Sequence, residues 1–580
     1  MVEQNNPSDA YETQSNPERW VMPVGAFIID SAAGIRVTNI NPTLRSVLTK
    51  EGQQIGQVFE ATIEANSGEE QALLEFRISN PGKCDVLTSG WQSWSTSVAA
   101  APAILPAEKL IGRKLYKKSL GGKTVPYFEP GPGGEKIPPD EGRSYGWVGF
   151  RDLKGGDNTV LGVIPSFDSL EDIRYRQEGD QIIVSVRKNL EGVNSQRPVT
   201  FKVFLGHVDR YADLMMVFSG ELSRLRGNVP LMKDRVIGFS WAAYGPAVTQ
   251  KDIQQEIKAG GGIYDTYVID DGWETVSGSL TVDQDKFPDL GGLAQQMKQA
   301  GIKPGIWVAP FKRKGGTGNL PREWFMQDEH GKPMKTPLPQ PLKLLENSFQ
   351  FDVSVPEFRA YSIDKLLDLA KMGFEVFKAD FLAAPFTGEL RNKDKTSVQY
   401  YRQYFEEFRQ RVRDELGKEI EIIGCGASVM ESVGLFEGMR ISPDSALQNL
   451  GNFINQMPLS RLWASRTNTD MYKGATSVSA HRVLPCQGAY GLILDGIHIV
   501  DNEIPLDSNK KRRLNQSMQA FNRLGIGNIF VGDSLARAGE QGKQVWRDFI
   551  SIIKRGNEEL VVDGDRLPEI PERFAPPKAA

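Results

Sequence analysis

The sequence predicts a multidomain fold in which an N-terminal antiparallel β-sandwich is followed by a (β/α)8 barrel, and three observations favour it. Short apolar runs broken by turn residues fill the chain from about Val21 to Phe218, with little helical periodicity. Beyond residue 226, apolar runs alternate with helix-length segments. Three of these later runs end directly in carboxylates, as strands do at the carboxyl-terminal face of a barrel.

Length and charge limit the classes of protein to which the chain can belong. At 580 residues it is too long for one ordinary domain, so two or three domains are expected. Its 40% hydrophobic and 24% charged residues are typical of globular proteins. The net charge of -4 gives no basic surface for nucleic acid or anionic membranes. The basic pair Lys-Lys at 117–118 and the basic triplet Lys-Arg-Lys at 312–314 are interpreted as solvated loop charges.

Cysteine and histidine usage gives no sign of a metal site. Cys84, Cys425 and Cys486 lie too far apart for a Cys-x-x-Cys motif, and their odd number argues against a disulfide framework. The four histidines are scattered without ligand spacing. We therefore expect neither a metal nor an organic cofactor.

The opening of the chain and its hydropathy predict a soluble, cytoplasmic protein. Residues 1–19 are polar and lack the basic and apolar regions of a secretory signal. No apolar run approaches the ~18 residues that a membrane-spanning helix needs. A sandwich beside a barrel offers surfaces for a homo-oligomer, but no motif specifies a symmetry.

The first part of the chain is expected to form a flexible tail at 1–20 and a sandwich domain at 21–225. A long excursion rich in glycine and proline runs from Gly121 to Gly142. The segment Ala212–Arg226 is amphipathic and predicts a linking helix. The clearest predicted strands are Gly25–Asp30, Gly56–Glu64, Ala72–Ser79, Thr159–Pro165, Gln181–Val186 and Val199–Leu205.

The second part is expected to form a barrel at 226–556 and a tail at 557–580. A doubly wound sheet is the alternative, but no glycine-rich phosphate motif follows an early strand. About 49 residues follow the last predicted strand, too few for a further sandwich of usual size, so little or no C-terminal β-domain is expected. The predicted strands are Val236–Trp241, Thr266–Ile269, Ile302–Val308, Glu375–Ala379, Glu421–Gly424, Met439–Ile441, a run near Gly491–Ile499, and Asn528–Val531. The predicted helices are Thr249–Ala259, Leu293–Ala300, Pro356–Met372, Ser397–Leu416, Arg512–Leu524 and Lys543–Arg555.

Asp380 and Asp444 follow the fourth and sixth predicted barrel strands and form a candidate catalytic pair. A retaining glycosidase uses one carboxylate as nucleophile and the other as acid and then base, at a separation of about 5–5.5 Å. Lys378 precedes Asp380 by two residues, so both side chains point to the same side of a strand. A neighbouring cation favours an ionised nucleophile. Asp444 follows Pro443 in a loop, where partial desolvation would raise its pKa for acid work.

Other residues near the strand ends suit a carbohydrate pocket. Asp270 and Asp271 offer bidentate acceptors for vicinal hydroxyls, and Trp241, Trp273 and Trp307 offer flat apolar faces. Each also has a plainer interpretation: aspartates cap helices and form turns, and single tryptophans usually belong to a core. The coincidence of three carboxylate clusters on successive strands favours the site.

The order of these motifs resembles that of the retaining α-galactosidases and α-N-acetylgalactosaminidases, and most closely glycoside hydrolase family 36. The resemblance rests on Asp270-Asp271-Gly272-Trp273, Gly305-Ile306-Trp307, Lys378-Ala379-Asp380, Cys425-Gly426 and Arg440-Ile441-Ser442-Pro443-Asp444. It covers about residues 235–531 and extends to Gly90-Trp91-Gln92-Ser93-Trp94-Ser95 in the predicted sandwich.

The resemblance implies roles for individual residues. It makes Asp380 the nucleophile and Asp444 the general acid/base. Asp270 and Asp271 are implied to hold O4 and O6 of a galacto-configured sugar, with Lys378 at O3 and O4.

The resemblance also implies the walls of the pocket. Trp307 is expected to stack on the sugar or close the pocket, and Trp91 and Trp94 to wall it unless they belong to the sandwich core. Arg440 and the Cys425-Gly426 turn are expected near the substituent at C2.

Two departures from the family pattern leave the specificity open. Some members carry a carboxylate at the position of Phe311, and many carry a glycine-rich run where this chain has Gly426 to Val429. The predicted activity is hydrolysis of terminal α-linked galactose in an oligosaccharide or glycoconjugate. The alternatives are an α-N-acetylgalactosaminidase, a galactosyl-transferring relative, an aldolase using Lys378, a metal-dependent enzyme using Asp270, Asp271 and Asp380, and a non-catalytic carbohydrate-binding protein.

Overall fold

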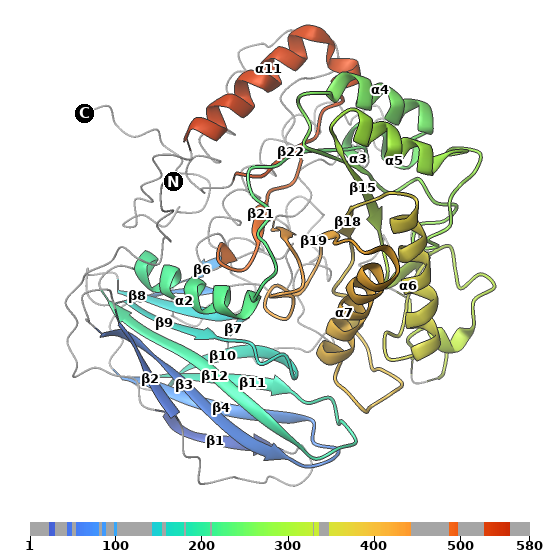
Figure 1. Ribbon diagram of the computed structural model, residues 1–580. Coiled ribbons are helices and arrows are strands. Elements are labelled where there is room, and N and C mark those ends of the chain that lie inside the picture. The colour runs from blue at the N-terminus through green and yellow to red at the C-terminus, as the bar shows by residue number, and fades with distance from the viewer. Residues whose placement is uncertain are drawn as a thin grey trace, which may run out of the picture.

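The computed structural model places an antiparallel sandwich beside a parallel barrel (Figure 1). This arrangement confirms the predicted fold class, an antiparallel β-sandwich followed by a (β/α)8 barrel. The structure describes residues 23–29, 43–48, 54–79, 84–88, 98–100, 142–152, 158–178, 181–208, 211–328, 330–335, 347–441, 486–496 and 527–556.

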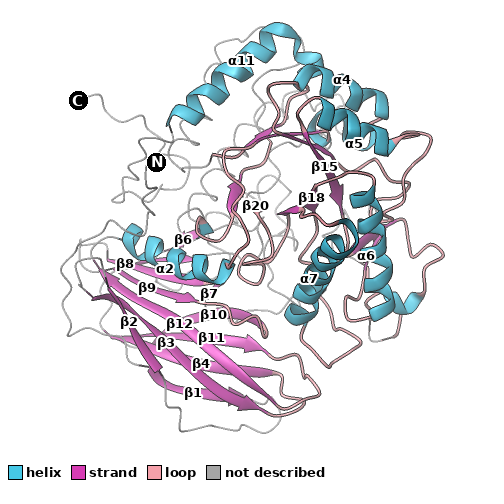
Figure 2. Cartoon of the chain, in the orientation of Figure 1, coloured by secondary structure: helices cyan, strands magenta, loops and turns pink. Residues whose placement is uncertain are grey.

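The sandwich consists of two antiparallel sheets (Figure 2). The first has the order β1 (Pro23–Ile29), β4 (Gln71–Ser79), β11 (Gln181–Asn189), β10 (Leu170–Glu178) and β7 (Gly142–Ser144). The second has the order β2 (Thr43–Leu48), β3 (Gln54–Ala65), β12 (Arg197–Val208), β9 (Asn158–Val163), β8 (Trp147–Asp152), β5 (Cys84–Thr88) and β6 (Val98–Ala100).

Alternating apolar residues of the two sheets form the sandwich core, as the period of two along a strand requires. Val184 of β11 and Phe201 of β12 are both fully buried in the same cluster. Phe59 of β3 and Phe76 of β4 meet edge to face with ring centroids 5.8 Å apart. These contacts hold the two sheets together around one hydrophobic core.

The barrel strands pair in the order in which they occur along the chain. Neighbouring strands are parallel, and a further parallel bridge between Ile493 and Asn528 joins the seventh strand to the eighth. The strands are β13 (Val236–Phe239), β14 (Thr266–Ile269), β15 (Lys303–Val308), β18 (Val376–Ala379), β19 (Glu421–Gly424), β20 (Gly438–Arg440), β21 (Gly491–Ile493) and β22 (Ile529–Val531). The (β/α)8 arrangement brings all their carboxyl ends to one face.

Capping residues explain where the best-predicted helix begins and ends. Thr396 and Gln399 form a capping box at the start of the helix Ser397–Leu416, and Gly417 ends it at φ 62°. The predicted helix 512–524 lies outside the described residues. The helices are α2 (Tyr211–Arg226), α3 (Trp241–Tyr244), α4 (Gln250–Gly260), α5 (Leu290–Gln299), α6 (Pro356–Lys371), α7 (Ser397–Leu416) and α11 (Leu535–Gly556). Two short strands, β16 (Lys312–Lys314) and β17 (Ser348–Gln350), form a separate two-stranded antiparallel sheet.

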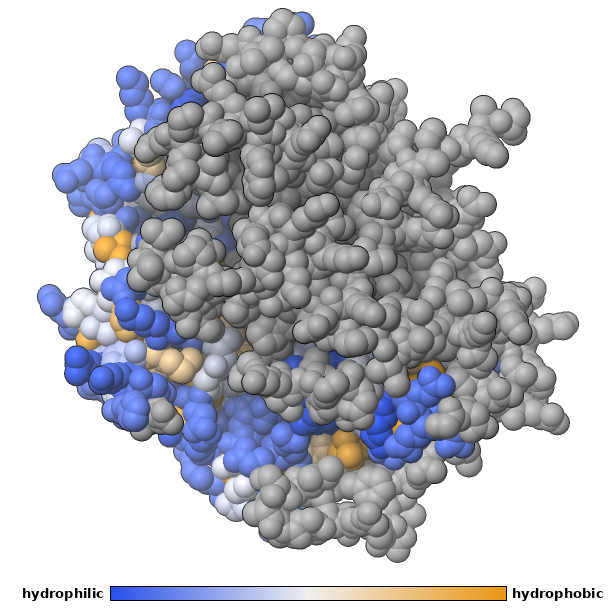
Figure 3. Space-filling model, turned by 180° about the vertical axis from the view of Figure 1, so that it is seen from behind, coloured by the Kyte–Doolittle hydropathy of each residue, from blue (hydrophilic) through white to orange (hydrophobic). Residues whose placement is uncertain are grey.

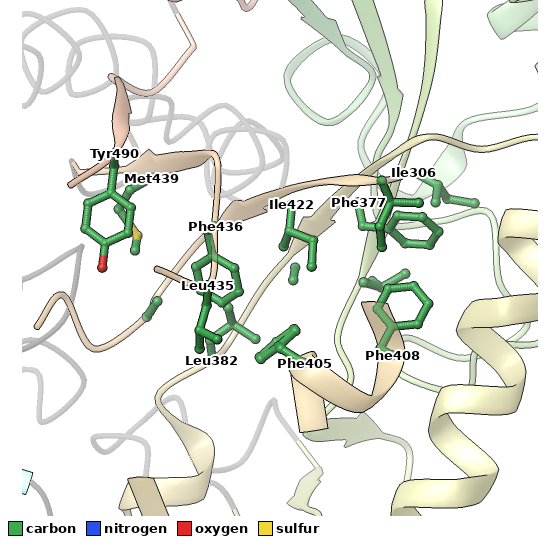
Figure 4. Packing of buried hydrophobic residues seen from close by; sticks show 14 of the residues in the cluster. Ile306, Phe377, Leu382, Phe405, Phe408, Ile422, Leu435, Phe436, Met439 and Tyr490 are labelled. Carbon is green, nitrogen blue, oxygen red and sulfur yellow. The ribbon is translucent and has the colours of Figure 1, made fainter. Parts of the chain in front are cut away.

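Helix α7 covers β18 and β19 with an aromatic face (Figure 4). Phe408 meets Phe377 of β18 edge to face at 5.2 Å, and Phe405 meets Phe436 at 4.9 Å. Burial of such large apolar side chains is the main force that holds the helix against the barrel.

The sandwich contacts the barrel at the amino end of α7. The half-buried carboxylate of Glu191 accepts hydrogen bonds from the backbone N of Ser397 at 2.9 Å and from its hydroxyl at 2.6 Å. The hydroxyl of Thr396 donates to the backbone O of Asp168 at 2.8 Å. A carboxylate at a helix amino terminus is stabilised by the exposed N–H groups there.

The described surface is mainly hydrophilic where it is visible from behind, with scattered apolar residues (Figure 3). In the described ranges, no helix combines the length and the apolar character needed to cross a membrane.

Replacement of Glu191 by Ala is expected to lower the free energy of unfolding by about 2 kcal/mol, because two buried donors on Ser397 lose their acceptor. Urea unfolding followed by tryptophan fluorescence measures the change. Glu389→Ala, at an exposed side chain, is the control and should leave the midpoint nearly unchanged. An unchanged midpoint for Glu191→Ala would show that this contact does not support the fold.

Candidate active site

A buried ion pair joins two barrel strands at their carboxyl ends. Asp270 follows β14, and its Oδ2 lies 2.7 Å from Nζ of Lys378 on β18. Both side chains are buried, at 2% and 6% exposure. The hydroxyl of Ser240, which follows β13, accepts from the backbone N of Asp270 at 2.9 Å. Three strands therefore fix this carboxylate.

The surroundings of Lys378 keep it charged. Burial alone would lower its pKa, but the neighbouring carboxylates of Asp270 and Asp380 outweigh this and raise the pKa above its ordinary value. Its Nζ also lies 5.5 Å and 5.7 Å from the ring centroids of Phe239 and Phe530. A firmly protonated lysine opposes the Schiff-base role considered for an aldolase.

Two N–H donors orient the carboxylate of Asp380. The indole Nε1 of Trp307 donates to Oδ2 at 3.0 Å, and the backbone N of Phe381 donates to Oδ1 at 2.7 Å. Phe381 adopts a φ of 55°, which a residue with a side chain rarely does. The sequence predicts that Lys378 lies beside Asp380. In the structure, the ammonium of Lys378 donates its hydrogen bond to Asp270.

The tryptophans near the site differ in burial. Trp307 is only 2% exposed and packs edge to face on Phe381, with centroids 6.4 Å apart. Trp273 is fully buried and donates to the backbone O of Trp307 at 2.8 Å, so it is a core residue and presents no face to a ligand. The predicted strand through Trp241 ends at Phe239, and Trp241 instead starts α3, where it is half-buried.

Asp271 lies beside the ion pair and is less buried. Its backbone N donates to Oδ1 of Asp270 at 2.9 Å. Burial, followed by the charge of Asp270, raises the pKa of Asp271 to about 6, against the opposing influence of Ser277 and Lys314. This carboxyl therefore changes charge in a pH range where many enzymes work.

Arg440 links the turn after β19 to the strand end of β21. Its Nε donates to Sγ of Cys425 at 3.1 Å, and its Nη1 lies 2.7 Å from Oδ1 of Asp495. The backbone N of Cys425 donates to the backbone O of Ala379 at 2.9 Å, and Gly426 follows with a φ of 57°. Cys425 and Gly426 thus follow β19, the strand next to β18, and Arg440 ends β20, the strand beyond it.

Sequence reasoning missed several residues that shape this region. Glu274 is buried and accepts from the backbone N of Gly278 at 2.7 Å and of Leu280 at 2.6 Å, and burial raises its pKa to about 8. Lys312 was expected to be solvated, which is wrong, because it is 8% exposed with Nζ 3.7 Å from the ring centroid of Phe381. The partner of Lys312 is 69 positions away, so no local pattern signals the contact.

Three predicted site residues, Asp444, Trp91 and Trp94, lie outside the described residues. Among the residues that the structure does describe, no group of three or more His, Cys, Asp or Glu side chains is arranged to hold a metal ion.

The barrel matches a known family of enzymes. Residues 229–477 match the family model described as "Glycosyl hydrolases family 31 TIM-barrel domain". The match covers less than half of the chain and lies in the barrel part of it. The family in its description differs from family 36, which the motif order resembles.

Solved structures similar to most of the chain are described as α-galactosidases. TtGalA from Thermus thermophilus, in complex with p-nitrophenyl α-D-galactopyranoside, is 17% identical, with a TM-score of 0.61 over 88% of this chain and 94% of that chain. The same protein in complex with stachyose gives a TM-score of 0.56 at 17% identity, over 85% and 97%. The family 36 α-galactosidase AgaA from Geobacillus stearothermophilus is 13% identical, with a TM-score of 0.57 over 92% and 75%. At these identities the likeness shows a shared fold.

Replacement of Asp271 by Asn should change the pH dependence of stability. A carboxyl whose pKa is higher in the folded state, about 6 against 3.8, contributes most below the unfolded pKa and loses that contribution as pH rises through 6. Relative to Asp271→Asn, the wild type should therefore become less stable between pH 4 and pH 7.5. Chemical unfolding of both proteins at several pH values measures this, and a constant difference would contradict the raised pKa.

Proposed function

We propose that the protein is an exo-acting glycoside hydrolase that removes terminal α-linked galactose with retention, through a covalent glycosyl-enzyme. The fold and the matched barrel family support a glycoside hydrolase. The ligands named for the similar structures, an aryl α-galactoside and stachyose, support a galactoside substrate. The motif order that resembles family 36 supports the retaining mechanism.

The observation that carries this proposal is the fixed carboxylate of Asp380 at the end of β18. In the proposed first step, one of its oxygens forms a bond to the anomeric carbon while the bond from that carbon to the leaving oxygen breaks. Each oxygen accepts one N–H bond and retains a further lone pair. The two donors, from Trp307 and Phe381, hold the carboxylate in one orientation, which reduces the entropic cost of reaching the transition state.

Asp444 is proposed as the second catalytic group, on the strength of the motif order alone. As general acid it would give a proton to the leaving oxygen. As general base it would then take a proton from the water that attacks the glycosyl-enzyme and frees the sugar.

The neighbouring polar groups are proposed to bind the sugar hydroxyls. Asp270 and Lys378 form a preorganised acceptor and donor pair, since each fixes the other without ligand. Asp271, ionised above pH 6, would accept from a further hydroxyl. Trp241, which is half-buried and packs against the cluster of buried residues that includes Trp307, is the proposed apolar platform, with Trp91 and Trp94 as proposed walls.

An α-N-acetylgalactosaminide is the second candidate substrate. The turn after Cys425 begins with two small residues, Gly426 and Ala427, beside the strand of Asp380. Small side chains at these two positions would leave room for a larger substituent at C2, such as an acetamido group. Transfer of galactose to a sugar acceptor uses the same first step and differs only in its products.

Replacement of Asp380 by Ala is expected to abolish turnover, because the nucleophile is lost. Initial rates on aryl α-galactoside and aryl α-N-acetylgalactosaminide measure the effect and the preference at C2. Asp285→Ala, at an exposed aspartate after β14, is the matched control and should keep wild-type rates. Substantial hydrolysis by Asp380→Ala would refute the assignment, and no turnover by the wild type on either sugar would favour a binding protein.

Replacement of Trp307 by Phe removes the indole N–H but keeps an aromatic ring. We expect kcat/KM to fall about tenfold, the effect of one hydrogen bond to a charged group. Trp324→Phe, at a tryptophan that packs on Phe358 and Tyr361 of α6, serves as control. Wild-type kinetics for Trp307→Phe would show that its bond to Asp380 has no part in the reaction.

A further inference from the structure

The loop between β19 and β20, residues 425–437, begins beside the proposed nucleophile. Its first residue, Cys425, donates from its N to the backbone O of Ala379 and accepts at its O from the N of Leu382, at 2.9 Å and 3.4 Å. These two partners flank Asp380 in the chain. A shift of this β19–β20 loop would therefore change the shape of the site next to Asp380.

The barrel holds the β19–β20 loop from one side. Arg402 of α7 donates from Nη1 to the backbone O of Glu431 and of Val433, both at 2.9 Å. The hydroxyls of Tyr401 on α7 and Ser432 lie 2.8 Å apart. These bonds fix the middle of the loop to a rigid helix.

The sandwich holds the same loop from the other side. The carboxylate of Glu431, which is 4% exposed, accepts from the hydroxyl of Ser428 within the loop and faces the backbone N–H of Glu171 on β10. Met430 packs against Gly146, where even a Cβ would overlap its side chain. Glu431 therefore joins the loop directly to a strand of the sandwich.

A second sandwich contact acts through Arg402. Phe167 has a φ of 62° and lies under the guanidinium of Arg402, 3.7 Å from its ring centroid. Stacking on an aromatic face restricts the guanidinium that binds the two loop carbonyls. The sandwich thus supports the loop both at Glu431 and at Arg402.

A buried charge network anchors the sandwich side of this contact. Lys188 is fully buried, with Nζ 2.7 Å from Asp168 and in contact with Glu171 and Ser166. Removal of one partner from such a network leaves an uncompensated buried charge. The network therefore holds the start of β10, where Glu171 lies, in a fixed position.

We propose that the sandwich is a specificity element of the sugar site, and that Glu431 is the positioning residue through which it fixes the β19–β20 loop beside Asp380. The inference rests on the proposed glycosidase function and deepens it. Glu431 itself touches no reacting atom. Its effect is on the wall of the pocket, and hence on which substituents of the sugar fit.

The test replaces Glu431 by Ala and by Gln in the full-length protein. Ala loses the carboxylate that accepts from Ser428 and faces Glu171, whereas Gln keeps an amide oxygen in its place. For Glu431→Ala we expect the ratio of kcat/KM for aryl α-galactoside to that for aryl α-N-acetylgalactosaminide to shift by about tenfold, the size of effect that one small group has in a pocket. Glu431→Gln should restore the wild-type ratio to within about twofold.

Hydrogen exchange of the loop amides gives a readout that needs no substrate. In Glu431→Ala the amides of residues 426–436 should exchange faster than in the wild type, because the loop opens locally at a lower free energy. Glu191→Ala is the matched control, since it removes another carboxylate contact between sandwich and barrel. It should leave both the ratio and the loop exchange unchanged.

The outcomes separate this inference from the proposed function. Unchanged loop exchange, or faster exchange with an unchanged ratio, would overturn the role of Glu431. If the wild type hydrolyses neither sugar, the proposed function fails instead, and the exchange data still decide whether Glu431 holds the loop.

Discussion

The buried ion pair of Lys378 and Asp270 is the constraint on which the rest of the site depends. Taking two charges out of water costs several kcal/mol for each ion unless the geometry and the further hydrogen bonds compensate. Here the ammonium and the carboxylate lie 2.7 Å apart, and Ser240 fixes the backbone that carries the carboxylate. The pair thus ties together the ends of β14 and β18, which β15 separates, and Asp380 lies two residues beyond Lys378.

The fold was predictable because its signals are local. Short apolar runs set the barrel strands, and the strand Thr266–Ile269 was predicted with its observed bounds, since Asp265 and Asp270 limit it on both sides. The helix Ser397–Leu416 was predicted equally well because Thr396 and Gly417 mark its ends. Boundaries drifted where no such marker exists, as at Trp241, which begins a short helix after a buried strand.

The site was only partly predictable because its contacts are distant in sequence. The carboxylates of Asp270 and Asp380 were found from their place after apolar runs, but the partner of each was not. Lys378 bonds to a residue 108 positions away, and Trp307 to one 73 positions away. The period of two along a strand indicates which side a residue faces, but it does not indicate which neighbour it meets there. The same limit hid the sandwich contacts of Glu431.

The left-handed backbone of Phe381 has a consequence for how this protein can change. A residue with a side chain at φ 55° costs about 1 kcal/mol or more, which glycine would not. Glycine at this position would remove that backbone cost, but it would also remove the ring that contacts Trp307 and Lys312, and the lost packing outweighs the gain. The strained backbone of Phe381 is thus maintained by the contacts of its own ring, and a substitution there would change the stability of the chain and the shape of the pocket together.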